Sequence, residues 1–292
     1  MPRPPRALSL PGLLGALSLL ALAAPTLAPL QSVIAAEPVS AGPPPTRAKV
    51  VSVYDGDTFT LDTGDRVRLS GANTPELKPY EPFAAEARDA AEAFLSGKQV
   101  QLHYGATERD HYGRLIASVT VDGQDLAQHL LERGLAHVFI VAPCDMDITE
   151  MLAAQGRARD AKIGLWTDSR YQGALHITSF HANGRGDERQ NVNAEYLRVA
   201  NVTTSPLNLD GYRIQDISGK SYNLPAVEIP AGYTFEIRSG VGTNQGDLSE
   251  PLVVYLGSDW PIWNNDRDRA TLLSPDGKIV DVREHEPKSR QN

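Results

Sequence analysis

Cysteine is almost absent from this 292-residue chain, in which Cys144 is the only example. A single thiol cannot form an intramolecular disulfide, which excludes a disulfide-stapled scaffold. Basic residues are also scarce, with 28 lysines and arginines against 36 aspartates and glutamates and a net charge of -8. This balance excludes a nucleic-acid clamp that works mainly through positive charge. The length is sufficient for two domains.

Long apolar runs are missing except near the N-terminus. There, two arginines precede an apolar stretch from Leu8 to Ala24, and small residues follow up to Ala36. This order is typical of a secretory signal peptide, so we expect residues 1–36 to be removed on export. An uncleaved anchor is the alternative, although the run is short for a bilayer span of about 20 residues. We therefore expect a secreted, periplasmic or cell-surface protein, with a stiff linker over 37–47.

Two regions with different patterns follow the linker. Up to residue 168, a hairpin is expected at 48–61 with its turn at Asp55-Gly56, further strands at 66–69, 100–104, 115–121 and 136–141, and helices at 81–95, 125–133 and 148–162. This mixture predicts a small five-stranded barrel with three helices packed on it over 48–168. From 173 to 284, helical periods disappear and seven short apolar runs alternate with turns, which predicts a β-sandwich. The fold class is thus mainly β with α, and residues 285–292 form a polar tail.

A group of oxygen-bearing side chains is expected in the first region. Asp55 and Asp57 share one turn, so their carboxylates are held near each other. Asn73 can add an amide oxygen and Thr74 a backbone carbonyl. Hard oxygen donors of this kind suit Ca²⁺. An Asp-Gly-Asp sequence is also common at plain hairpin turns, so this group alone does not establish a metal site.

The same region carries groups suited to phosphodiester hydrolysis. That reaction needs positive charge on the phosphate oxygens and a group that orients or deprotonates water. Arg68 and Arg114 are fork-shaped donors that match phosphate oxygens. Glu76 follows a strand end and is the candidate base. Each residue alone has an ordinary structural explanation, and their joint occurrence in this order is what indicates a nuclease.

In this order, the motifs resemble those of the thermonuclease, or staphylococcal-nuclease-like, family over roughly Lys49 to Trp166. The matching segments are Asp55-Gly56-Asp57-Thr58, Arg68-Leu69, Asn73-Thr74-Pro75-Glu76, Asp110-His111-Tyr112-Gly113-Arg114 and Gly134-Leu135-Ala136. The resemblance implies an OB-fold barrel and a Ca²⁺-dependent endonuclease. It also implies cleavage of DNA and RNA that leaves 3′-phosphorylated products.

The resemblance also implies a role for each matching residue. The catalytic residues would be Arg68, Glu76 and Arg114. The metal ligands would be Asp57, Asn73 and Thr74. The substrate contacts would be Tyr112 and Asp55.

Two departures from the family pattern, together with the net charge of the region, weaken the expected grip on metal and substrate. Asn73 replaces an aspartate, which keeps an oxygen but removes a charge, so Ca²⁺ should bind more weakly and other divalent ions are alternatives. Ile140 and Ala142 replace a pair of tyrosines, so base stacking should be poorer. Residues 47–168 hold 13 basic and 19 acidic side chains, a net charge of -6. Binding to nucleic acid should therefore be modest.

The second region resembles a lamin-tail domain over about Gly173 to Glu284. The matching segments are Glu195-Tyr196, Leu209-Asp210-Gly211-Tyr212, Pro230-Ala231-Gly232, Trp263-Asn264 and Ala270-Thr271-Leu272. The resemblance implies an immunoglobulin-like sandwich that binds or anchors and does not catalyse. In an exported protein, a partner at the cell surface or envelope is one candidate for this domain. The alternative to the nuclease is a non-catalytic protein that binds nucleic acid or interacts with the cell envelope.

Overall fold

The computed structural model describes residues 43–184, 187 and 189–285. The expected signal peptide at 1–36, the first part of the linker and all but the first residue of the expected tail lie outside these residues. Within the described ranges, no helix combines the length and apolar character that a membrane crossing needs.

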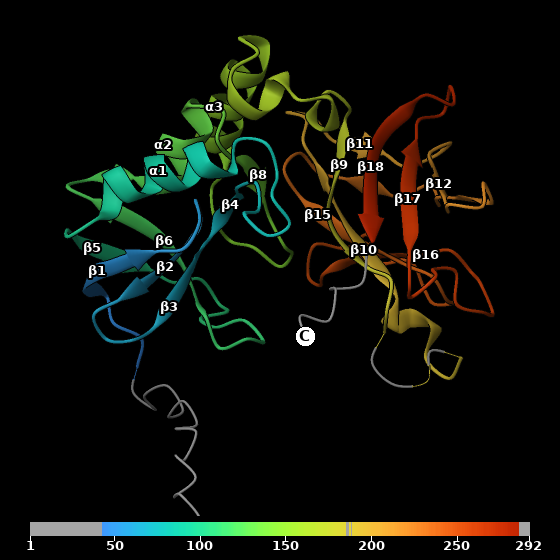
Figure 1. Ribbon diagram of the computed structural model, residues 1–292, viewed down its shortest axis with the longest axis horizontal. Helices are drawn as coiled ribbons and strands as arrows, with labels where there is room; N and C mark the ends of the chain where they lie inside the picture. Colours follow the sequence, from blue (N-terminus) through green and yellow to red (C-terminus); the bar gives the residue numbers. More distant parts are fainter. Residues whose placement is uncertain (1–42, 185–186, 188, 286–292) are drawn as a thin grey trace, which may run out of the picture. The chain divides into compact units, whose positions relative to one another are not determined.

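A barrel forms the first part of the described chain (Figure 1). Its strands are β1 (Arg47–Val53), β2 (Thr58–Leu61), β3 (Arg66–Leu69), β5 (Gln99–His103) and β6 (Leu115–Val121). They run in the order β3-β2-β1-β5-β6, and parallel pairing of β3 with β6 closes the barrel. Alternate residues of β6 are buried, as the period of a strand with one face on a core requires. The predicted five-stranded, OB-like barrel is confirmed.

Three α-helices of the described chain, α1 (Ala84–Leu95), α2 (Leu126–Glu132) and α3 (Thr149–Asp160), gather on one side of the barrel in Figure 1. Buried Ala87, Ala91 and Leu95 lie four residues apart on one face of α1, which is how a helix presents a single stripe to a core. Asp125 caps α2 by accepting a hydrogen bond from the Gln128 backbone N–H at 2.8 Å. All three expected helices are present.

Two short strands were not expected from the sequence. β4 (Gly71–Asn73) pairs with β8 (His137–Phe139), and β7 (Gln124–Asp125) pairs with the end of β6. A strand of three residues is too short to show alternation, so the sequence gives no signal for β4. The strand expected at 136–141 is shorter than predicted and corresponds to β8. The pairing of β4 with β8 places Asn73 opposite His137, which matters for the site.

The second part is a sandwich, as predicted. One sheet has the order β16 (Leu252–Tyr255), β15 (Thr234–Arg238), β10 (Tyr196–Asn201), β9 (Leu175–His181). The other has the order β13 (Ser221–Asn223), β12 (Arg213–Gln215), β17 (Asp268–Leu273), β18 (Ile279–His285). A small sheet pairs β11 (Leu207–Asn208) with β14 (Glu228–Ile229). The remaining elements are 3-10 turns, η1 (Gly164–Thr167), η2 (Ser169–Tyr171) and η3 (Val192–Ala194).

Buried polar contacts join the barrel to the sandwich. The Gln155 side chain accepts a hydrogen bond from the Val138 N–H at 2.7 Å and donates one to the Val202 carbonyl at 3.2 Å. The Ile140 N–H donates to the Gly232 carbonyl at 2.9 Å. Gly232 has φ +75° and approaches so closely that a Cβ there would lie 2.6 Å from Val138, so only glycine fits. Because buried hydrogen bonds cross the junction, the two domains form one packed body.

Candidate active site

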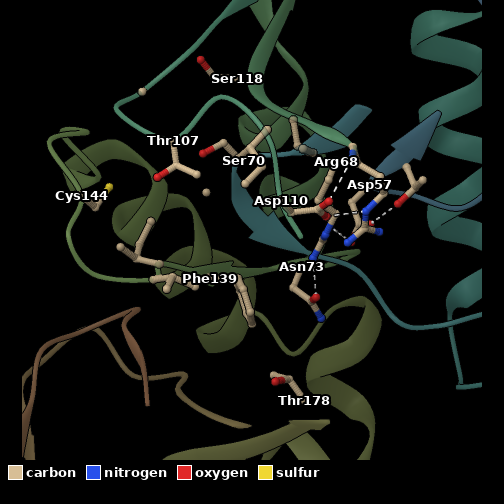
Figure 2. Close-up of a pocket in the computed structure, with 18 of the residues that line it drawn as sticks. Asp57, Arg68, Ser70, Asn73, Thr107, Asp110, Ser118, Phe139, Cys144 and Thr178 are labelled. Atoms are coloured by element: carbon tan, nitrogen blue, oxygen red, sulfur yellow. Dashed lines mark hydrogen bonds and ion pairs between the residues drawn. The ribbon is translucent and has the colours of Figure 1, made fainter. Parts of the chain in front are cut away.

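A cavity of about 830 Å³ contains the side chains predicted to act on a phosphodiester. Seven of the eight predicted site residues line it, and Figure 2 labels three of them, Asp57, Arg68 and Asn73. The eighth, Thr74, is buried directly behind Asp57. The full set of predicted residues on the cavity surface is Asp55, Asp57, Arg68, Asn73, Glu76, Tyr112 and Arg114.

Asp57 connects the turn between β1 and β2 to the segment after β4. One carboxylate oxygen, Oδ2, accepts hydrogen bonds from the Thr74 N–H at 2.8 Å and the Thr74 hydroxyl at 3.0 Å. The other, Oδ1, accepts from the Thr58 hydroxyl at 3.1 Å. Asp57 is only 4% exposed, and a carboxylate so deeply buried is stable only when its oxygens are satisfied. These bonds fix its position at the floor of the cavity.

Arg68, on β3, lies between Asp57 and Asn73. Its Nη1 forms an ion pair with Oδ2 of Asp57, and its Nη2 donates to Oδ1 of Asn73 at 2.6 Å. The guanidinium carbon also lies 5.9 Å from the centre of the Phe139 ring. A planar guanidinium that is bonded on two sides and packed against a ring has a well-defined orientation. Arg68 is therefore preorganised at the edge of the cavity.

His137 explains why an amide rather than a carboxylate stands at position 73. The Nδ1 of His137 lies 2.9 Å from the Val138 carbonyl, to which it donates, so Nε2 is the acceptor. Nε2 accepts from Nδ2 of Asn73 at 3.3 Å, and the same Nδ2 donates to the Thr74 carbonyl at 3.2 Å. Burial, followed by the charge of His176, lowers the pKa of His137 to about 3, which keeps it neutral. The Asn73 amide is thus held with its oxygen toward Arg68.

Acidic groups crowd the floor of the cavity. Burial, then the charges of Asp57 and Glu76, raise the pKa of Asp55 to about 7. The pKa of Glu76 is also raised, first by burial and then by Asp57. Carboxylates held together away from water destabilise each other's charged form. A bound cation would relieve this repulsion.

The oxygen types at this floor suit a hard divalent ion. They are the carboxylate of Asp57, the amide oxygen of Asn73 and the carbonyl of Thr74, with Asp55 beside them, and such oxygens are the ligands that Ca²⁺ prefers. The Asn73 oxygen accepts a hydrogen bond from Arg68 and the Thr74 carbonyl accepts one from Nδ2 of Asn73, and an ion would have to replace these bonds. Within the described ranges, no cluster of three or more His, Cys, Asp or Glu side chains has the arrangement of a metal site. The fit therefore depends on the oxygens at positions 73 and 74.

Arg114 reaches the cavity from a different direction, at the end of the loop that precedes β6. Its Nε donates to Oδ2 of Asp110 at 2.7 Å, and its backbone N–H donates to Oδ1 at 2.9 Å. Burial alone would raise the pKa of Asp110, but these bonds from Arg114 outweigh it and lower that pKa. Tyr112 is 67% exposed, with the Arg114 guanidinium carbon 5.4 Å from its ring centre. Arg114 thus lines the same cavity but is held through Asp110.

Two residues important to this geometry were not singled out in the sequence. His137 directly follows the Gly134-Leu135-Ala136 motif, but one histidine has no spacing that indicates its partner. Asp110 stands four residues before Arg114 and forms an ion pair with it. A carboxylate at the start of a tight loop commonly accepts hydrogen bonds from backbone N–H groups further along the chain. This spacing could therefore have suggested that the two residues are in contact. The roles of the eight predicted residues stay predictions, although the structure brings all of them to one place.

Comparisons with known proteins assign a family to each of the two domains. The family model described as Staphylococcal nuclease homologue matches residues 66–168, and the Lamin Tail Domain model matches 168–286. The thermonuclease of Staphylococcus hyicus is 31% identical over 127 residues, which are 41% of this chain and 75% of that protein. Endonuclease YncB of Bacillus subtilis is 31% identical over 126 residues, or 40% of this chain and 60% of the relative.

A relative from a plant also matches the nuclease domain. The staphylococcal-like nuclease CAN1 of Arabidopsis thaliana is 28% identical over 104 residues, which cover 36% of this chain and 30% of that protein. A barrel of this topology with this cavity defines a staphylococcal-nuclease-like protein. The chain belongs to the thermonuclease family, and it carries a lamin tail domain after the nuclease domain.

Proposed function

We propose that this protein is an exported, metal-dependent endonuclease that hydrolyses phosphodiester bonds of DNA and RNA and leaves 3′-phosphorylated ends. The observation that carries the proposal is the cavity that holds Asp57, Arg68, Glu76 and Arg114 together. Relatives named thermonuclease and endonuclease support the reaction class. The cavity supplies arginines for phosphate oxygens and a carboxylate for water, which is what this reaction needs.

Each side chain has a distinct part in the proposal. Arg68, already oriented by Asp57 and Asn73, binds a non-bridging phosphate oxygen. Arg114 neutralises charge that develops on the phosphate and on the leaving oxygen. Glu76 orients or deprotonates the attacking water, and its raised pKa lies nearer the operating pH that general base catalysis favours.

We propose Asp57, Asn73 and the Thr74 carbonyl as the residues that hold Ca²⁺, with Asp55 beside them. The bound ion would supply positive charge close to the phosphate. Asn73 brings no charge of its own, so affinity should be lower than with a third carboxylate. Mg²⁺ and Mn²⁺ are therefore included in the test.

The test is cleavage of heat-denatured DNA by the purified chain from residue 37 onward, with each metal titrated and then removed by chelation. We expect cleavage with Ca²⁺, and a loss of about 100-fold or more for Glu76→Gln and for Arg114→Ala. The products should resist extension by a DNA polymerase until a phosphatase removes their 3′-phosphates.

Matched controls come from α1, away from the cavity. Glu92→Gln and Arg88→Ala change the same residue types in residues that do not line the cavity, and should leave cleavage unchanged. A wild-type protein that binds DNA but stays inert with Ca²⁺, Mg²⁺ and Mn²⁺ would establish the non-catalytic binding alternative.

Export is part of the proposal and has its own test. The arginines and apolar run before Ala36 support removal of residues 1–36 by a signal peptidase. N-terminal sequencing of the exported protein should find Glu37 as the first residue. Retention of Met1 on a membrane-bound chain would favour the uncleaved anchor.

A further inference from the structure

The cavity has a second wall that the nuclease domain does not provide. Six of its lining residues come from the lamin tail domain: Thr178, Ser179, His181, Tyr196, Arg198 and Pro251. Figure 2 shows Thr178 of this wall in the same pocket as Asn73 and Phe139 of the barrel. Because hydrogen bonds through Gln155 and Gly232 tie the domains together, this wall has a fixed place. The cavity therefore offers surface of both domains to a strand that fills it.

Two aromatic side chains form a stack on the second wall. His181 of β9 and Tyr196 of β10 are directly opposite each other in the antiparallel register, so they share one face of the sheet. Their ring centres are 4.3 Å apart and the ring planes differ by 19°. The Arg238 guanidinium carbon lies 6.0 Å from the Tyr196 ring centre, and His181 is exposed. The stack therefore has a supported end at Tyr196 and an open end at His181.

A second pair of rings approaches this stack from the loop that carries Arg114. His111 and Tyr112 have ring centres 3.7 Å apart. Although the side chain is exposed at its surface, partial desolvation by its neighbours and then the charge of Arg198 lower the pKa of His181, and the charge of His111 contributes to the same shift. Burial and then Glu236 raise the pKa of Tyr196, and Tyr112 contributes there. Both ring pairs line the same cavity.

The charges at and beside the second wall partly cancel. Glu236 forms ion pairs with both Arg198 of the wall and Arg238 behind it, so two positive charges and one negative charge leave a net charge of +1. Next to a nuclease domain that is itself acidic, this charge adds little attraction for the phosphate backbone. Flat ring surfaces are what the wall offers, and unpaired bases stack on such surfaces whatever their sequence.

On the basis of the proposed function, we propose that His181 and Tyr196 of the lamin tail domain form a base-stacking subsite for single-stranded DNA or RNA. The strand lies with its scissile phosphate at Arg68 and Arg114, and an unpaired base of the same strand stacks on His181. Ile140 and Ala142, where the family resemblance implies a pair of tyrosines, are buried and aliphatic. The second domain thus adds ring surface to that which barrel residues such as Tyr112 already bring to the cavity.

The experiment measures binding of a dye-labelled oligothymidylate of about ten nucleotides, a length within the site size of such domains. Binding is measured by fluorescence anisotropy in chelator, on the chain from residue 37 onward. We expect His181→Ala and Tyr196→Ala to raise Kd about 5- to 100-fold, the loss that removal of one stacking ring produces. Tyr196→Phe keeps the ring and should stay within about twofold of wild type.

Trp260→Ala is the matched control, since Trp260 is a 67% exposed aromatic of the same domain that does not line the cavity. It should bind as wild type does. A blunt duplex has no unpaired base to offer, so its affinity should be independent of residues 181 and 196. Equal Kd values for wild type, His181→Ala and Tyr196→Ala on the single strand, or no binding by the wild type, would overturn the subsite.

A second measurement does not depend on the variants folding. Ultraviolet cross-linking of wild-type protein to an oligonucleotide with iodinated uracil bases should label His181 or Tyr196, as mapped by mass spectrometry. Labels confined to the barrel would overturn the proposal. If the wild type binds and cross-links at this wall but cleaves nothing with any metal, the nuclease proposal fails while the subsite stands. If the wild type cleaves and neither His181→Ala nor Tyr196→Ala changes binding, the subsite proposal fails while the nuclease proposal stands.

Discussion

The two arginines of the cavity are held in opposite ways. Arg68 is a strand residue with a side chain 16% exposed, and it contacts Asp57, Asn73 and the Phe139 ring. Arg114 ends a loop, has a side chain 28% exposed, and takes its orientation from Asp110. Arg68 is thus part of the packed structure around the buried acids. Arg114 lies at the rim of the cavity, formed by Asp110, Tyr112 and Arg114, and is held there by the carboxylate of Asp110.

The difference separates stability from chemistry. Arg68 neutralises buried carboxylates whether or not substrate is present, so it contributes to folding as well as to phosphate binding. Arg114 and Asp110 are closer to solvent, and such pairs contribute little to stability. We therefore infer that the floor of the cavity is a folded-state requirement, while the rim can be adjusted at little cost to the fold.

The largest expected effects come from replacing either arginine, and they test whether the two arginines are held differently. Both Arg68→Ala and Arg114→Ala should lower cleavage by about 10²- to 10³-fold, because each removes a phosphate donor. Only Arg68→Ala should also lower the free energy of unfolding by about 3–5 kcal/mol, because it leaves the buried Asp57 carboxylate without its partner. Arg114→Ala should lower it by about 1 kcal/mol or less. The cleavage assay measures the loss of activity, and denaturant unfolding without metal measures the free energy of unfolding of each variant.

The pH dependence of the loss of stability gives a control for the Arg68→Ala result. The folded-state pKa of Asp55, about 7, lies above its ordinary value of 3.8, so its contribution to stability is present below pH 3.8 and is lost as the pH rises toward 7. The penalty of Arg68→Ala should therefore be smaller at about pH 5 than at about pH 8. Equal losses of stability in the two arginine variants would show that the floor and the rim are not different.

Much of the fold followed from local patterns, and the misses have tertiary causes. The strand expected at 115–121 is found with those bounds because alternation with a buried face leaves one register. The helix expected from Glu81 begins instead at Ala84, because Phe83 has a left-handed φ of 70° that interrupts the helical backbone. Glu81 lies outside the helix, where its carboxylate accepts from the Glu76 N–H at 2.9 Å and pairs with Arg283 of β18. No sequence window contains both Glu81 and Arg283.

The candidate site was predictable to a similar extent. The motif order grouped Asp57, Arg68 and Asn73, because short turns between strands keep such residues close. His137 could not be assigned to Asn73, since their contact depends on the three-residue pairing of β4 with β8. The second wall could not be foreseen either, because the way two domains pack leaves no local signal in either domain.

A smaller effect sharpens the comparison at the floor. Asn73→Asp adds a charged ligand, so Ca²⁺ affinity should rise about tenfold. Without metal, the same variant should be less stable than wild type, because a carboxylate oxygen then faces the lone pair of His137 and the Thr74 carbonyl, where an N–H now donates. Calorimetric titration and thermal unfolding with and without Ca²⁺ measure the two effects.

A double variant tests the physical reason. His137→Gln added to Asn73→Asp places an amide that can donate to the new carboxylate, so part of the lost metal-free stability should return. The same replacement in the wild-type background should give no such gain. If Asn73→Asp is as stable as wild type in chelator, the His137 contact does not select the amide.

The smallest effect concerns the rim, where Asp110→Asn keeps the shape of the side chain and removes its charge. Oδ1 can still accept from the Tyr112 and Arg114 N–H groups, so the loop should persist, with stability changed by less than about 1 kcal/mol. Arg114 loses its charged partner and becomes less well oriented, so kcat should fall about tenfold. KM should stay level or fall, because the cavity has lost a negative charge that repels substrate. A rise in kcat would instead mean that Asp110 withholds Arg114 from the phosphate, which would make the rim an inhibitory contact rather than a positioning one.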